Sequence, residues 1–139
     1  MRRPLWLLAA ASALVLAGTA AAGGWATVKL SSLPKGLSAG QPWVVNITVL
    51  QHGRTPVDGL KPTVTIRKVA RTTSTTSRMV GSETRTFAAR QTDGTGVYRA
   101  RVVFPTAGTW RFEVYDAFTE YGGARTHRFA PVKVTRRGA

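Results

Sequence analysis

Residues 92–116 read TDGTGVYRARVVFPTAGTWRFEVYD, and this stretch decides the fold class. Two runs alternate apolar and polar side chains, one from Tyr98 to Phe104 and one from Trp110 to Val114, with a Pro/Gly turn between them. Alternation with a period of two residues is typical of β-strands that bury one face and expose the other. We therefore expect the two runs to form a hairpin in an antiparallel sheet.

The chain after the first two dozen residues has the same character throughout. Segments rich in Gly, Pro and Ser separate five further strand candidates, and no helical periodicity interrupts them. These candidates lie at residues 25–30, 42–50, 62–69, 84–89 and 127–134, with a polar loop at 70–82. Pro131 should make the last candidate an edge strand or give it a bulge. About seven short strands predict an all-β domain, an immunoglobulin-like antiparallel β-sandwich.

Five residues are expected to hold this sandwich together. Trp43, Tyr98 and Trp110 should place large rings in the core, which has no disulfide to support it because the chain contains no cysteine. Asp93 and Gly96 should build the turn before Tyr98. The Tyr98 hydroxyl should then bond back to the backbone of that turn, as in a tyrosine corner.

The N-terminus has the pattern of a signal peptide. A basic start precedes an apolar run of about 12 residues and a series of small residues ending at Ala22, which is the pattern of a secretory leader helix. A retained anchor is the alternative, although the run is shorter than the ~20 residues of a spanning helix. We therefore predict a signal peptide at 1–22, a sandwich at 23–135 and a basic tail at 136–139. The protein should be secreted, periplasmic or on the cell surface.

The chain is strongly basic. Lys and Arg number 20 against 6 acidic residues among 139, giving a formal net charge of +14. Such a charge can indicate nucleic acid, an anionic membrane or an anionic cell-wall polymer as the partner. The basic residues are dispersed along the sequence, so we expect them on the solvent faces of strands and do not expect nucleic-acid binding. Electrostatic adhesion to an anionic polymer or lipid remains an alternative function.

No arrangement of residues indicates catalysis. The sequence has no nucleophile–base motif, no phosphate-binding loop and no pair of carboxylates, so we expect no enzyme activity and no cofactor. Copper is the alternative, with His52 and His127 as ligands, because strands of alternating direction would bring both to one end of the sandwich. The competing interpretation is one histidine in a surface turn and another at the start of a strand.

A recognition surface on loops is a further hypothesis. Phe118 and Tyr121 lie in a predicted loop at 117–125, outside any strand pattern. Together with His52 they could bind a partner, since β-sandwiches often carry their binding residues on loops. Alternatively, Phe118 folds back over the end of the core. The expected partner is an extracytoplasmic protein or an anionic surface.

Three short motifs stand out: Gly96-x-Tyr98, the sequence FPTAGTW at 104–110, and QHGRTP at 51–56. Together they resemble the YtkA-like family of exported bacterial domains and, more distantly, FixH. The resemblance covers about residues 24–134. It implies an immunoglobulin-like fold outside the cytoplasm, with suspected links to metal handling or the assembly of respiratory complexes. We therefore expect a non-catalytic binding or interaction module, with copper handling or complex assembly as the alternative.

Overall fold

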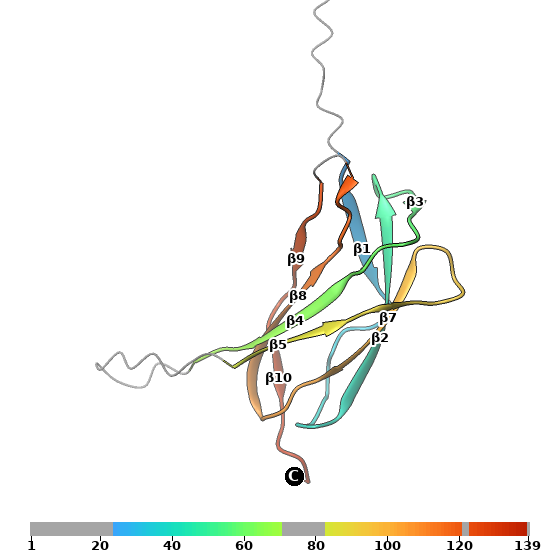
Figure 1. Ribbon diagram of the computed structural model, residues 1–139. Helices are drawn as coiled ribbons and strands as arrows, with labels where there is room; N and C mark the ends of the chain where they lie inside the picture. Colours follow the sequence, from blue (N-terminus) through green and yellow to red (C-terminus); the bar gives the residue numbers. More distant parts are fainter. Residues whose placement is uncertain (1–23, 71–82, 121–122, 139) are drawn as a thin grey trace, which may run out of the picture.

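The computed structural model describes residues 24–70, 83–120 and 123–138 (Figure 1). The described residues form two antiparallel sheets, without any α-helix. The first sheet has the order β1-β2-β7-β6, with β3 also paired to β2, and the second has the order β10-β8-β4-β5, with β9 also paired to β8. The prediction of an all-β sandwich is therefore confirmed. The predicted signal peptide and residues 71–82 of the polar loop lie outside the described residues.

Each sheet contains three longer strands and two short ones. The first sheet consists of β1 (Ala26–Leu30), β2 (Pro42–Gln51), β3 (Thr55–Pro56), β6 (Arg90–Gln91) and β7 (Val97–Val103). The second consists of β4 (Thr63–Lys68), β5 (Thr84–Ala88), β8 (Gly108–Tyr115), β9 (Thr126–Arg128) and β10 (Val132–Val134). Strand β2 pairs with β1 on one side and β7 on the other, so its predominantly apolar sequence fits a central position.

The core consists of the inward-facing side chains that the alternation predicts. Trp43, Tyr98 and Trp110 are all buried, with exposed fractions of 5%, 0% and 0%. The Trp43 ring contacts Phe112 of the opposite sheet edge-on, with the ring centroids 5.3 Å apart. Indole N–H groups of the two tryptophans also have acceptors, the Ser32 hydroxyl for Trp43 and a backbone carbonyl for Trp110, each at 2.9 Å. Large rings therefore join the two sheets without leaving a buried donor unpaired.

The predicted hairpin between the two runs of residues 92–116 is wrong. Strand β7 pairs with β2 and β6, whereas β8 pairs with β4, β9 and β10, so the two strands belong to different sheets. The connection at 104–107 is therefore an arch that crosses from one sheet to the other. Phe104 and Trp110 meet inside this arch with ring centroids 5.7 Å apart. The apolar faces of β7 and β8 therefore pack against one another across the core.

The predicted last strand at 127–134 is interrupted. Strands β9 and β10 both pair with β8 and with no other strand in the described part of the chain, and residues 129–131 separate them. Pro131 has no N–H to donate to a ladder, which is why the strand breaks there and lies at an edge, as expected. Phe129 covers the break by stacking on Phe112, with the ring centroids 5.0 Å apart.

Candidate functional site

The loop after β3 is closed by the side chain of Tyr98. Its hydroxyl donates to the Val57 carbonyl at 2.6 Å and accepts the Leu60 N–H at 3.0 Å. The expected corner therefore exists, but it is made with residues 57–60 rather than with the turn before Tyr98. Burial raises the pKa of the Tyr98 hydroxyl, the Leu60 N–H lowers it, and the nearby charge of Asp58 raises it further.

Asp58, rather than Asp93, connects this loop to the turn before β7. The Asp58 carboxylate accepts the Gly96 N–H at 2.6 Å and a side-chain N–H of Gln91, whose own carbonyl accepts the Gly59 N–H at 2.9 Å. Asp93 is exposed and has no hydrogen bond or ion pair within the described residues, so no contact seen there supports its predicted structural role. A carboxylate distant in sequence has that role instead.

Gly96 is structural, as expected, and for two reasons. Its φ of 68° lies in the left-handed region. A Cβ at this position would also lie 2.6 Å from the Cβ of Pro56 and 2.7 Å from the backbone nitrogen of Val57. Glycine therefore allows the turn and the loop after β3 to touch.

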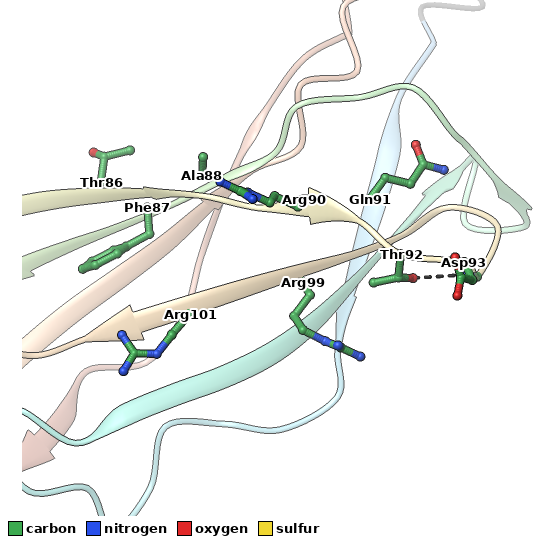
Figure 2. A pocket seen from close by; sticks show the side chains of 10 residues that line it. Thr86, Phe87, Ala88, Arg90, Gln91, Thr92, Asp93, Arg99 and Arg101 are labelled. Atoms are coloured by element: carbon green, nitrogen blue, oxygen red, sulfur yellow. Dashed lines mark hydrogen bonds between the residues drawn. The ribbon is translucent and has the colours of Figure 1, made fainter.

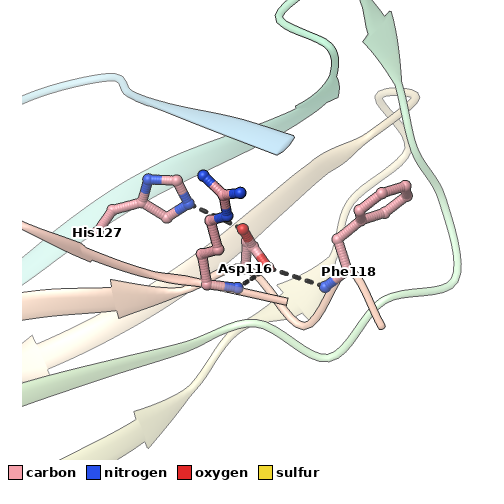
Figure 3. A network of polar contacts seen from close by, with 4 residues as sticks. Asp116, Phe118 and His127 are labelled. Atoms are coloured by element: carbon pink, nitrogen blue, oxygen red, sulfur yellow. Dashed lines mark hydrogen bonds and ion pairs between the residues drawn. The ribbon is translucent and has the colours of Figure 1, made fainter. Parts of the chain in front are cut away.

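A buried carboxylate organises the end of β8 (Figure 3). Asp116 is 0% exposed. One carboxylate oxygen accepts the backbone N–H groups of Phe118 at 2.9 Å and Arg125 at 3.1 Å. The other accepts the Nε2–H of His127 at 2.8 Å, because an ionised carboxylate can only accept. Asp116 thus fixes both ends of the loop at 117–125 and joins it to β9.

The two histidines predicted as metal ligands have different partners. His52 is exposed in the turn after β2, with φ of 50°, and its ring centroid lies 5.4 Å from that of Trp25. His127 is half-buried, and its Nε2 is engaged by Asp116. Only its Nδ1 remains for a metal ion. Within residues 24–70, 83–120 and 123–138, no three His, Cys, Asp or Glu side chains are grouped so as to hold a metal ion.

The predicted aromatic recognition surface is corrected by the burial of Phe118. This ring is 1% exposed and belongs to the hydrophobic core, because the bond from its N–H to Asp116 turns the loop back over the sandwich. A ring with so little exposed area cannot contribute contact to a partner. Tyr121, the second aromatic residue of that hypothesis, lies outside the described residues.

The structure instead gathers arginines into an open groove between β5 and β7 (Figure 2). The groove has a volume of about 830 Å³. In Figure 2, Arg99 and Arg101 extend from β7, and the Phe87 ring points from β5 into the space between the strands. We call this feature the arginine groove; its charged and aromatic lining residues are Phe87, Arg90, Asp93, Arg99 and Arg101.

The arginine groove carries an uncompensated positive charge. Arg90 lies directly opposite Arg99 in the β6–β7 ladder, and like charges in directly opposed positions destabilise a sheet. Neither residue, nor Arg101, forms an ion pair within the described part of the chain. Arg99 donates its Nε–H to the Asn46 side-chain carbonyl at 3.2 Å, which holds its stem in place. Among the described residues that line the groove, Asp93 is the only acidic one.

The sequence contained signals for two of the features that it did not predict. Asp116 follows Val114 by two residues, so continued alternation places it on the buried face of β8. Strands β6 and β7 together contain three arginines and no acidic residue. These arginines come together because Arg90 lies opposite Arg99. Sequence periodicity does not predict that register. The expectation of dispersed surface charge is corrected on this face.

Among the described residues, no helix has the length and apolar character needed to cross a membrane.

None of the curated proteins is similar enough to this sequence to count as a match. The family model described as YtkA-like matches residues 21–115. The match covers the strands from β1 to β8, including the arginine groove and the Tyr98 corner, and ends before Asp116. Because it spans more than half of the chain, the protein belongs to the YtkA-like family.

Proposed function

We propose that this protein is a non-catalytic binding module that works outside the cytoplasm and recognises an anionic partner through the arginine groove. The observation that carries the proposal is the opposed pair of Arg90 and Arg99, accompanied by Arg101 and lacking any ion-pair partner among the described residues. Such a pair costs stability in the free protein. An anionic partner would compensate this cost by neutralising the charges.

The location of these arginines on strands favours recognition over general adhesion. The Arg99 stem is held by Asn46, and cross-strand pairing fixes the position of Arg90 relative to Arg99. Guanidinium groups bind carboxylates and phosphates through paired N–H donors, so a fixed pair can select the geometry of its ligand as well as the charge. The signal-peptide pattern of residues 1–22 supports a site of action outside the cytoplasm.

Charge-matched variants of the two sheets would test this proposal. The triple variant R90Q/R99Q/R101Q removes three positive charges from the arginine groove. The control R67Q/R111Q/K133Q removes three from the outer face of the second sheet, where Arg67 also lies opposite Arg111. Binding to poly-glutamate should weaken by about tenfold or more in the groove variant and much less in the control, because close contacts are screened less than distant charges.

Salt titration provides the second measurement. If the protein only adheres electrostatically, both triple variants should lose affinity equally, and wild-type binding should vanish steeply with increasing ionic strength. Equal losses in the two variants would refute the arginine groove as the binding site. Circular dichroism of both variants would confirm that they remain folded.

A further inference from the structure

We infer that the partner of the arginine groove is an extended peptide in which acidic and apolar residues alternate, bound as an added β-strand along the edge of β7. This inference rests on the proposed function and specifies the class of partner. It depends on three features: an open backbone edge, the cations beside it and an aromatic side chain on its inner side.

The open edge follows from the hydrogen bonds at the ends of β7. The Thr92 N–H donates to the Val97 carbonyl at 2.9 Å, and the Gly96 carbonyl accepts the Val49 N–H of β2 at 2.9 Å. Backbone groups point to opposite sides at successive residues of a strand. The odd-numbered residues of β7 therefore direct their N–H and C=O groups away from β2, toward β6.

Strand β6 covers only the beginning of this edge. It pairs Gln91 with Tyr98 and Arg90 with Arg99 and then ends. The residue before β6, Ala89, lies beside the second sheet instead, where its N–H donates to the Pro62 carbonyl at 2.9 Å. The backbone groups of Arg101 and Val103 on this side have no backbone partner within the described residues. Uncovered groups of this kind can pair with an incoming strand.

The side chains beside the open edge define the chemistry of the strand that would fit. A residue of an added strand that lies opposite Arg101 shares the outer face with Arg99 and Arg101, so an acidic side chain is favoured there. Its neighbours point to the inner face, toward the half-buried Phe87 ring, so apolar side chains are favoured at those positions. The resulting pattern has a period of two residues.

A second copy of this protein is a poor occupant of the same edge. Pairing β7 with β7 would bring two sets of Arg99 and Arg101 side by side, which like-charge repulsion opposes. Asp93 lies at the far end of the groove, in the turn before β7, and is outnumbered there by three arginines, which leaves two positive charges in excess. An acidic peptide is therefore the occupant that charge complementarity favours.

Two capped peptides of identical composition would test the inference. In one, Glu and Val alternate; in the other, all the Glu residues precede all the Val residues. The alternating peptide should bind wild-type protein about tenfold or more tightly, because only it presents acids to one face and methyl groups to the other. N-methylation of the residues facing β7 should abolish this binding, whereas N-methylation of the residues between them should not.

Amide hydrogen exchange of the complex would identify the edge. Binding of the alternating peptide should slow the exchange of Arg101 and Val103. Ala100 and Val102 serve as internal controls, since their amides already face β2. Equal binding of both peptides without selective protection would overturn the added strand and leave the anionic groove intact. If poly-glutamate also fails to bind, both the inference and the proposed function are wrong.

Discussion

Two carboxylates hold two loops of this sandwich, and they do so in opposite ways. Asp116 is fully buried and bonds to residues 118, 125 and 127, all close to it in sequence. Asp58 is exposed and bonds to Gln91 and Gly96, more than thirty residues away. The buried carboxylate shapes one loop from within, whereas the exposed one connects two loops across the surface.

This difference determines how much each carboxylate contributes to the stability of the folded protein. Removing an acceptor from a buried site leaves its donors without water, which costs more than the bond itself contributes. Around Asp58, by contrast, solvent can replace part of what is lost. The two loops should therefore respond unequally to equivalent substitutions, and four experiments would measure how unequally.

Asp116→Ala should have the largest effect. It leaves the N–H groups of Phe118 and Arg125 unpaired and removes the partner of His127. Loss of a buried charged partner of this kind costs about 3–5 kcal/mol of unfolding free energy. Urea denaturation followed by tryptophan fluorescence would measure the loss. A cost comparable to that of Asp58→Ala would contradict the contrast drawn from burial.

Tyr98→Phe should have an intermediate effect. The ring remains in the core, but the Val57 carbonyl and the Leu60 N–H lose their partner. Leaving such groups unpaired costs about 1–3 kcal/mol. The same denaturation assay applies, with a conservative substitution at the exposed Tyr115 as the control. If stability does not change, the corner contributes nothing beyond ring burial.

Asp58→Ala should cost about 1 kcal/mol, because the carboxylate is exposed and solvent can replace part of its hydrogen bonding. Amide hydrogen exchange would show which loop is destabilised by this substitution. The Gly96 amide should exchange faster in the variant, while the amides of Phe118 and Arg125 should be unaffected. Faster exchange at both loops would show that they are energetically coupled.

Alkaline pH should produce the smallest effect, which should act through the Tyr98 corner. The folded-state pKa of Tyr98 is raised above the ordinary value of about 10, so the folded protein holds this proton more tightly than the unfolded chain does. Its contribution is fully present below the unfolded pKa and is lost as pH rises through the folded pKa. Tyr98→Phe should therefore show a weaker loss of stability above about pH 10 than wild type does.

Sequence reasoning predicted which side chains face inward but not which strands are neighbours. The alternation in β7 and β8 correctly placed Tyr98 and Trp110 in the core. It could not distinguish a hairpin from an arch, because both bury the same alternate residues. Contacts between residues that are distant in the sequence were also not predicted. Asp58 and Gly96 lie 38 positions apart, and no local pattern relates them.

The arch at 104–107 has a consequence for how the chain acquires its structure. Strand β7 joins β2 in the first sheet, and β8 joins β4 in the second, so Pro42 pairs with Val103 and Thr63 with Tyr115. The first sheet cannot close until residue 103 has emerged, and the second cannot pair β4 with β8 until residue 115 has emerged. Topologies dominated by such distant pairings fold slowly, in about milliseconds to seconds. With no cysteine to trap intermediates, folding should be a single late event that begins only when most of the polypeptide is available.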